Sequence, residues 1–299
     1  MTIHPSFRGG VAVITGAGSG LGAAMAASFA AQDMTVFALD IDGEQAELTA
    51  RTLREQGGRA HALAVDVADH AALLAAADEV REKVGHCSVL CANVGVQQFG
   101  AADALTQNDW RWVLDVNVMG VVNTVDAFLP LLRESSREHS SQDRSSLDNS
   151  ATGSLSRHIV ITSSSAAYSP GIRMGAYTTS KYAVTGYGET LRLELADEGI
   201  GVSLLFPAGM STRHLQSSQL ARPAELGPSE LRREDIDAMM QSRKIDTGDH
   251  VATAEYATRH LLEELAANRR YIITHGDCRE AILDQHDELL AAQERALQP

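Results

Sequence analysis

Short apolar, β-branched runs alternate with alanine-rich amphipathic segments along most of the chain. Seven of these runs have the length and composition of buried strands, and the segments between them show the apolar spacing of helices. The predicted strands are VAVIT (11–15), TVFALD (35–40), HALAV (61–65), SVLCA (88–92), HIVIT (158–162), VSLLF (202–206) and YIIT (271–274). Strands that alternate with helices predict an α/β fold, a doubly wound parallel sheet with helices on both faces.

Three segments fall outside this alternation. Residues 134–157 are polar and serine-rich, and we expect a mobile surface insertion because such a sequence buries too little apolar surface to offset the entropy of ordering. Residues 208–249 spread leucines and methionines through polar sequence, which favours an ordered substrate lid over an ordinary surface excursion. Residues 276–297 carry an apolar stripe with helical spacing and predict a terminal helix.

The 299 residues are expected to form one domain. A parallel α/β fold of about 250 residues can be a single domain, so the length does not require two. The apolar fraction of 44% and the charged fraction of 21% are typical of globular proteins and argue against a largely disordered chain. The surplus over one α/β domain falls in the 134–157 insertion and the 276–297 helix.

The chain carries a formal net charge of −14 at pH 7. A surface of this sign repels phosphate backbones and anionic lipids, so we expect a small-molecule ligand and no nucleic-acid or membrane partner. No apolar run approaches the roughly 20 residues that span a bilayer, and the start lacks a signal peptide's apolar stretch, so a cytoplasmic protein is expected. Three cysteines and scattered histidines predict neither a disulfide framework nor a metal site.

The first predicted strand runs through TGAGSGLG (15–22) directly into a helix. Glycines allow a sharp turn and a close backbone approach to a pyrophosphate, and the helix N-terminus offers unpaired N–H groups and partial positive charge. The residues of this predicted dinucleotide cradle are Gly16, Gly18, Ser19, Gly20, Leu21 and Gly22. No GKS or GKT follows, which disfavours a P-loop nucleotide hydrolase.

Asp40 ends the second predicted strand, near the spacing after the glycine loop expected for an acid that binds a ribose. Its carboxylate could accept hydrogen bonds from both ribose hydroxyls and would repel a 2′-phosphate. Ile41 follows, and the glycine loop contains no arginine. The sequence therefore predicts NAD rather than NADP; the alternative is an aspartate that only caps the next helix.

A tyrosine and a lysine four positions apart lie in the helical pattern around YTTSK. Tyr177 and Lys181 therefore share one helix face. A tyrosine has a reference pKa of about 10 and is a poor base at neutral pH unless positive charge stabilises the phenolate, and Lys181 supplies such a charge. Ser163, Ser164 and Ser165 end the preceding strand, at the carboxyl edge of a parallel sheet, where ligands bind.

These motifs together resemble the classical short-chain dehydrogenase/reductase family over about residues 8–275. The resemblance is carried, in chain order, by TGAGSGLG, Asp40, Asp66-Val67, CANVG (91–95), Asn117, the serine cluster, YTTSK and PAG (207–209). It implies a Rossmann-type fold, a nicotinamide cofactor and an oxidoreductase that exchanges a hydride and a proton with its substrate.

The resemblance also implies roles for individual residues. Tyr177 matches the family's general acid or base, Lys181 the residue that lowers its pKa and binds the nicotinamide ribose, and Asn117 the residue that holds a water of the proton relay. Ser164 matches the catalytic serine because it precedes the tyrosine by thirteen positions, although Ser163 or Ser165 could take its place. The further implied cofactor contacts are Asp66, Val67, Asn93, Gly95, Pro207, Gly209, Met210 and Thr212.

Two motifs depart from the family's pattern. Where the family usually has Asn-Asn-Ala-Gly, this chain has Ala92 at the first position and Val94 at the third. Ala208 stands between Pro207 and Gly209, which weakens the expected nicotinamide contact only if that position needs a positive φ. None of the four catalytic positions is missing, which argues against a non-catalytic relative.

We therefore expect an NAD(H)-dependent oxidoreductase that interconverts a hydrophobic, aromatic or polycyclic secondary alcohol and its ketone. The candidate pocket residues are Gln97, Gln98, Phe99, Ala166, Tyr168, Met174 and Met210, with the lid's leucines and methionines. Because Arg173 and Arg213 could bind a carboxylate, a substrate with a carboxylate group stays an alternative. The spacing of Tyr177 and Lys181 favours carbonyl and alcohol chemistry over enoyl reduction. The alternative from another class is an NAD-sensing protein whose lid or insertion contacts a partner.

A homodimer or a homotetramer is expected from the resemblance, with the dimer favoured. Relatives pair the long helices that match residues 110–133 and 176–197, and many form tetramers through the last strand. The terminal helix predicted at 276–297 could cover the edge of that strand or swap onto a neighbour.

Overall fold

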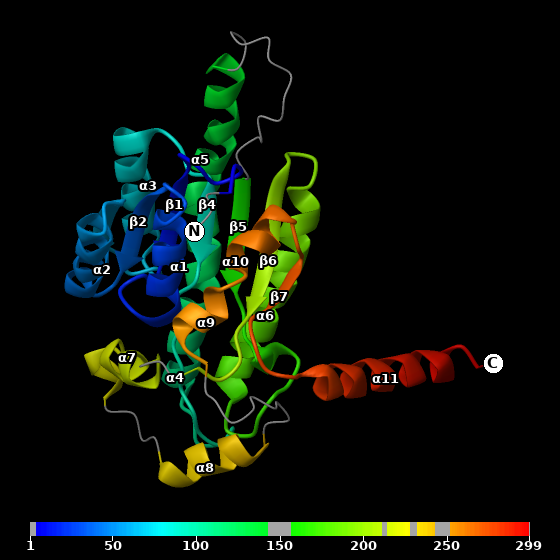
Figure 1. The fold of residues 1–299 in the computed structure, drawn as a ribbon. Helices are drawn as coiled ribbons and strands as arrows, with labels where there is room; N and C mark the ends of the chain where they lie inside the picture. The colour runs from blue at the N-terminus through cyan, green and yellow to red at the C-terminus, as the bar shows by residue number, and fades with distance from the viewer. Residues whose placement is uncertain (1–3, 143–156, 211–213, 228–231, 243–251, 299) are drawn as a thin grey trace.

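The computed structural model describes residues 4–142, 157–210, 214–227, 232–242 and 252–298. These residues form a parallel sheet of seven strands in the order β3-β2-β1-β4-β5-β6-β7 (Figure 1). The strands are β1 (Val11–Thr15), β2 (Thr35–Asp40), β3 (Arg59–Ala64), β4 (Val89–Ala92), β5 (Arg157–Thr162), β6 (Ile200–Phe206) and β7 (Tyr271–Ile273). They lie at the predicted positions, which confirms the doubly wound α/β fold.

Helices cover both faces of this sheet (Figure 1). The helices that share a core with one face are α3 (His70–Val84), α5 (Gly120–Gln142) and α6 (Gly175–Glu194). Those on the other face are α1 (Gly20–Ala30), α2 (Gly43–Glu55), α9 (Ala254–Thr258) and α10 (Leu261–Ala266). The strand order reverses between β1 and β4, and sheets of this kind bind ligands in the crevice outside the carboxyl ends of those strands.

Residues of each strand alternate between the two cores. In β1, Val11 and Val13 pack with α3, α5 and α6, whereas Ala12 and Ile14 pack with α1. All five residues of β1 are buried because helices cover both faces. This double cover explains why the predicted strands are unbroken apolar runs rather than alternating ones.

The helices at the carboxyl edge of the sheet surround the ligand crevice. They are α4 (Gln107–Leu114), α7 (His214–Leu220), a 3₁₀ turn η4 (Ala224–Leu226) and α8 (Arg233–Ser242). In Figure 1 they lie below the sheet, at the end where the strands finish. The last three belong to the predicted 208–249 lid, whose other parts at 211–213, 228–231 and 243–249 lie outside the described residues.

The helix predicted around residues 110–133 is longer than expected. α4 continues through a π-helical turn (Asp115–Met119) into α5, which reaches Gln142. The predicted 134–157 insertion therefore begins as a helix, and its part at 143–156 lies outside the described residues. A short 3₁₀ turn, η3 (Ser165–Ala167), follows β5.

The same helical stretch is more apolar than the sequence analysis allowed. By length and composition Gln107–Ser135 could cross a membrane, with a mean hydropathy of 1.3 in its most apolar window. Half of that window is buried inside the fold, where Phe128, Leu131 and Leu132 pack into the core shared with the sheet. These are the contacts of a core helix.

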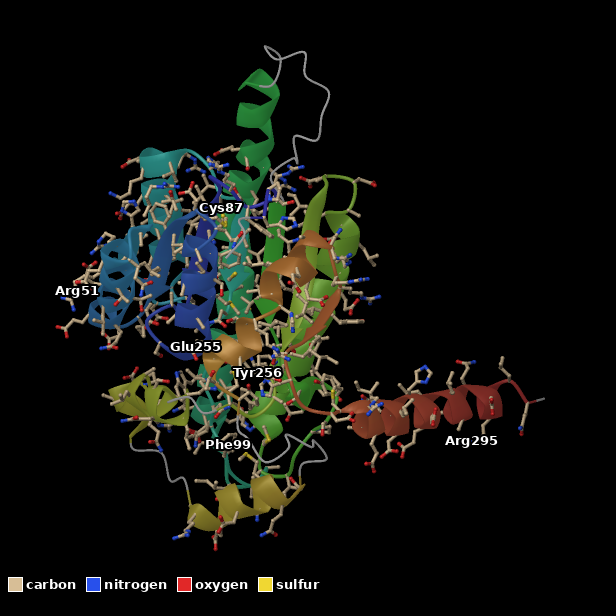
Figure 2. All side chains as sticks on the ribbon, viewed as in Figure 1. Arg51, Cys87, Phe99, Glu255, Tyr256 and Arg295 are labelled. Carbon is tan, nitrogen blue, oxygen red and sulfur yellow. The ribbon has the colours of Figure 1, made fainter. Side chains whose placement is uncertain are left out.

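The terminal helix α11 (Arg279–Ala296) forms at the predicted place but does not cover the last strand. It projects away from the body of the molecule in Figure 1, and Figure 2 shows Arg295 near its outer end. Leu289 is 65% exposed on α11, and Tyr271 on β7 is 50% exposed. Of the two predicted placements of this helix, the one that covers the edge of the last strand of its own chain is therefore wrong.

Candidate active site

The glycine loop between β1 and α1 packs too tightly to admit a side chain at Gly18 or Gly22. The Gly18 N–H donates to Asp40 Oδ2 at 2.9 Å, and a Cβ on Gly18 would lie 2.8 Å from that oxygen. A Cβ on Gly22 would lie 2.1 Å from the Gly16 carbonyl oxygen, because the first turn of α1 crosses the loop closely. Ser19, the residue before α1, makes no side-chain cap, so the first N–H groups of the helix are available to an anion. The loop fits the pyrophosphate of a dinucleotide.

Asp40 lies at the end of β2 with its carboxylate oriented by two backbone N–H groups. Gly18 donates to Oδ2, and Asp42 donates to Oδ1 at 3.0 Å. Burial nevertheless raises the pKa of Asp40, since it disfavours the charged form more than these two hydrogen bonds favour it. Further donors, such as a pair of ribose hydroxyls, would stabilise this carboxylate.

The carboxyl ends of β1, β4 and β5 are tied together by one asparagine. Asn93 donates from its backbone N–H to Thr15 Oγ1 at 3.0 Å and from its side-chain amide to the Thr15 carbonyl at 3.1 Å. Its Oδ1 accepts from Thr162 Oγ1 at 2.9 Å. This bracing fixes the three strand ends, which form the floor of the crevice, and Thr15 and Thr162 were not singled out by the sequence analysis.

Tyr177 and Lys181 lie one turn apart on α6 and both line the crevice. Lys181 is 2% exposed, its Nζ donates to the Thr162 carbonyl at 3.0 Å, and it lies 5.6 Å from the centre of the Tyr177 ring. Burial lowers the pKa of Lys181 to about 8. At neutral pH the lysine is therefore mostly protonated, and its positive charge is fixed beside the tyrosine.

The three serines after β5 have different surroundings. Ser164 lines the crevice and its Oγ accepts from the Ala166 N–H at 3.1 Å, which leaves its hydroxyl proton for another acceptor. Ser163 Oγ donates to the Lys181 carbonyl at 3.2 Å and lies 2.8 Å from Thr185 Oγ1, so it braces α6. Ser165 is fully buried. Of the three, Ser164 has the surroundings that suit a substrate-binding hydroxyl.

Asn117 lies in the π-helical turn between α4 and α5 and is fully buried. Its Oδ1 accepts from the Val96 N–H at 2.7 Å, and its Nδ2 donates to the Val96 carbonyl at 3.0 Å and to Ser180 Oγ at 2.9 Å. The side chain thus holds the segment after β4 against α6. Single π turns often occur at functional sites.

One crevice of about 1200 Å³ brings most of the predicted residues together. The predicted cofactor residues that line it are Gly16, Gly18, Ser19, Gly20, Leu21, Gly22, Asp40, Ile41, Asp66, Val67, Asn93, Gly95, Tyr177, Lys181, Pro207, Gly209 and Met210. Asn117 lies behind the wall rather than in it, and Thr212 lies outside the described residues. Ala208 does not adopt a positive φ, so the alanine costs this loop no backbone strain.

The end of the crevice next to Tyr177 is apolar. Its lining includes Phe99, Met174, Met210, Leu215 and Met239. Phe99, Met174 and Met239 share a small core with Tyr177, and Figure 2 shows Phe99 below the sheet. Of the other predicted pocket residues, Gln97 lines the crevice, whereas Gln98, Ala166 and Tyr168 do not. Arg173 pairs with Asp235 at 3.0 Å, and Arg213 lies outside the described residues.

Sequence reasoning missed a set of residues on the segment after β6. We call residues 214–227, which comprise α7 and η4, the strap. His214 is half-buried with Nε2 2.8 Å from the Gly95 carbonyl, and desolvation lowers its pKa, so the imidazole is neutral at pH 7 and Nε2 donates. Its ring meets that of Tyr177 edge-on, with centroids 6.5 Å apart. The available signal was the position of His214, immediately after the segment that matches the family's nicotinamide contacts.

Comparison with known proteins gives relatives over nearly the whole chain. The chain is 30% identical over 282 residues to a Cα-dehydrogenase from Sphingobium sp. (strain NBRC 103272 / SYK-6), an alignment that covers 94% of this chain and 85% of the relative. It is 28% identical over 285 residues to a 1-deoxy-11-beta-hydroxypentalenate dehydrogenase from Streptomyces exfoliatus, with 93% and 87% covered.

A solved structure supports the same assignment. A short chain dehydrogenase/reductase from Burkholderia phymatum, in complex with NAD, is 31% identical, superposes with a TM-score of 0.81 and shares 96% of each chain. The family model for short chain dehydrogenases matches residues 10–141 and 146–223. The chain therefore belongs to the short chain dehydrogenase/reductase family of oxidoreductases.

Proposed function

We propose that this oxidoreductase uses NAD(H) to interconvert a hydrophobic secondary alcohol and its ketone. The observation that carries the proposal is that Tyr177, Lys181 and Ser164 line one crevice with an apolar end, together with a glycine loop that leaves no room for a side chain at Gly18 or Gly22. These groups can move a proton and bind a developing oxyanion, which is what carbonyl and alcohol chemistry requires.

The choice of NAD over NADP rests on Asp40. Its carboxylate is half-buried and oriented by Gly18 and Asp42, so a 2′-phosphate brought beside it would meet an uncompensated negative charge. Two ribose hydroxyls would instead donate to it. The structural relative from Burkholderia phymatum holds NAD.

In the proposed reaction, the Tyr177 oxygen takes the proton of the alcohol during oxidation and returns it during reduction. The Lys181 ammonium, fixed by the Thr162 carbonyl, stabilises the phenolate form. Ser164 donates a hydrogen bond to the substrate oxygen as negative charge develops there. Bound NAD supplies the acceptor for the carbinol hydride. Asn117 keeps the segment that includes Val96 in place against α6 and, with Thr212, completes the proposed site.

The substrate class follows from the apolar end of the crevice. Phe99, Met174 and Met239 surround the approach to Tyr177, and the nearby Arg173 is paired with Asp235 rather than held for a substrate acid. An aryl or polycyclic secondary alcohol suits these walls better than a sugar. Two of the relatives named above, a Cα-dehydrogenase and a 1-deoxy-11-beta-hydroxypentalenate dehydrogenase, are dehydrogenases by name.

The charge of the chain and its cysteines indicate the proposed cellular setting of the enzyme. The net charge of −14 disfavours nucleic-acid and membrane surfaces as partners, and Cys87, Cys91 and Cys278 are buried free thiols, as suits a reducing cytoplasm. We propose a homodimer or homotetramer, as expected from the family.

A panel of secondary alcohols tests the proposed function. Purified protein is incubated with NAD and with aryl, polycyclic, aliphatic or polyol substrates, and NADH formation is followed at 340 nm. Turnover should be fastest with an aryl or polycyclic alcohol. NADH binding without turnover of any alcohol or ketone would instead support an NAD-sensing protein, and turnover confined to polyols would contradict the proposed substrate class.

A further inference from the structure

Arg222 is a buried cation that the proposed chemistry does not use. Its side chain and that of Asp109 are each 8% exposed, and Nη2 donates to Asp109 Oδ1 at 2.6 Å. Nη1 donates to Gln98 Oε1 at 3.2 Å, and Nε donates to the Gly227 carbonyl at 2.8 Å. The guanidinium also lies 5.4 Å from the centre of the Trp112 ring. One side chain thus joins the strap to α4 and to the segment after β4.

Asp109 is fixed on its other side as well. Its Oδ2 accepts from the Thr106 backbone N–H at 2.8 Å and from Thr106 Oγ1 at 2.7 Å, in a capping box that begins α4. Burial alone would raise the pKa of Asp109, but the hydrogen bonds from Thr106 and Arg222 outweigh it and hold the pKa below its usual value. The carboxylate that receives Arg222 is therefore charged and held rigidly.

The strap makes two further polar contacts along the same neighbouring segment. His214 Nε2 donates to the Gly95 carbonyl, and the Gln97 backbone N–H donates to Ser218 Oγ at 3.0 Å. With the contact between Arg222 and Gln98, the strap has three attachments, at Gly95, Gln97 and Gln98. The strap is therefore fastened along its length and not only at its ends.

The strap lines the same cavity as the predicted dinucleotide-binding residues. Its lining residues include Leu215, Ser217, Ser218, Leu220, Ala221, Pro223, Glu225 and Leu226. These share one cavity with the glycine loop, Asp40 and Asp66. A dinucleotide bound on that loop would therefore share its cavity with the strap.

We propose that Arg222 is a positioning residue that holds the strap closed over the dinucleotide groove, so that release of Arg222 from Asp109 and Gln98 limits dinucleotide dissociation. The inference rests on the proposed function only as far as dinucleotide binding. Opening of the strap would separate the buried guanidinium of Arg222 from the buried carboxylate of Asp109. This separation costs free energy because each charge loses its partner before water reaches it. The groove can therefore retain a dinucleotide through a contact between two residues that do not line it.

The test is the rate at which NADH leaves the protein, measured by stopped-flow fluorescence after the complex is mixed with excess NAD. Arg222→Met keeps a long side chain over Trp112 but removes the ion pair, and we expect NADH to leave about tenfold faster or more. Asp109→Asn should accelerate release similarly. The double variant should be no faster than the faster single variant, because both changes break one contact.

The control is Arg232→Met. Arg232 forms a pair with Glu234 in which the side chains are 62% and 74% exposed, so its loss should leave NADH release unchanged. Arg222→Lys keeps the positive charge but lacks the several N–H donors of the guanidinium, and it carries the test should Arg222→Met fail to fold. NADH should leave Arg222→Lys faster than wild type but more slowly than Arg222→Met or Asp109→Asn. Urea denaturation of each variant separates loss of overall stability from faster release.

Two results would overturn the proposal. Equal NADH release from wild type, Arg222→Lys and Asp109→Asn would show that this contact does not limit dissociation, even if stability falls. A change in KM for the alcohol alone, with NADH release unchanged, would assign the strap to the substrate only. If wild-type protein gives no NADH fluorescence change at all, dinucleotide binding itself fails and the proposed function fails with it.

Discussion

The floor of the crevice and the strap above it are held by different kinds of contact. The floor consists of the carboxyl ends of β1, β4 and β5 with Tyr177 and Lys181 of α6, and the three strands are joined by the regular backbone pairing of the sheet. The strap has two short helical pieces and depends on isolated side-chain contacts such as that of Arg222 with Asp109. The comparison suggests that the floor performs the chemistry and the strap controls what stays bound.

Substitution of the floor tyrosine should give the largest effect. Tyr177→Phe removes the group that exchanges a proton with the substrate and keeps the ring that packs with Phe99 and Met174. We expect kcat to fall at least about a hundredfold, with NADH affinity retained. Steady-state kinetics and NADH fluorescence titration check this, and near-normal turnover would remove Tyr177 from the mechanism.

The serine cluster tests which strand-end hydroxyl belongs to the chemistry. Ser164→Ala should lower kcat about a hundredfold, because it removes the donor to the developing oxyanion. Ser163→Ala should have a smaller effect, since Ser163 braces α6 through the Lys181 carbonyl. Comparison of the two kcat values decides the assignment, and a larger loss in Ser163→Ala would reverse it.

Asp40 tests the dinucleotide side of the floor. Asp40→Asn keeps the shape of the side chain but removes its charge, so KM for NAD should rise about tenfold while KM for NADP falls. Asp42→Asn is the comparison, because Asp42 caps α2 through the Glu44 and Gln45 N–H groups and leaves Asp40 charged. Unchanged preference in Asp40→Asn would mean that Asp40 does not select the cofactor.

The burial of Lys181 should have a smaller effect than these substitutions, and the effect should appear in the pH dependence of the free energy of unfolding. Its pKa is about 8 in the folded protein and about 10.4 in an unfolded chain, so between these values the unfolded state binds more protons. Wild type should therefore gain stability relative to Lys181→Met as the pH rises through this window, by up to about 1.4 kcal/mol per pH unit.

Urea denaturation of both proteins at several pH values between 7 and 10 measures this slope. Lys83→Met, which removes a lysine that is 41% exposed, is the control and should not change the slope. A difference between wild type and Lys181→Met that does not vary with pH would mean that Lys181 is less buried than its 2% exposure indicates.

The floor could be predicted from the sequence because local patterns determine it. The apolar runs gave the seven strands, and the glycine loop, Asp40 and the pair Tyr177 and Lys181 fell at one edge because parallel strands end together. Each of those features can be recognised from a short stretch of the sequence.

Residues 208–249 were predicted to form a lid, which includes the strap, but the contacts of the strap could not be predicted because they join distant segments. Arg222 lies 113 positions from Asp109 and 124 from Gln98, and no periodicity links them. His214 lies 119 positions from Gly95 and was one scattered histidine among others in the sequence. The direction in which α11 projects could not be predicted either, because its apolar stripe predicts a helix but not the surface that the stripe contacts.

Transfer of a deuterium from the substrate tests most directly whether this crevice performs alcohol oxidation. The best alcohol of the panel, deuterated at its carbinol carbon, is incubated with NAD, and the NADH formed is analysed by mass spectrometry. We predict one deuterium per NADH with wild-type protein and almost no labelled NADH with Tyr177→Phe. Unlabelled NADH would contradict direct hydride transfer at the site described, and as much labelled NADH from Tyr177→Phe as from wild type would remove Tyr177 from the proposed mechanism.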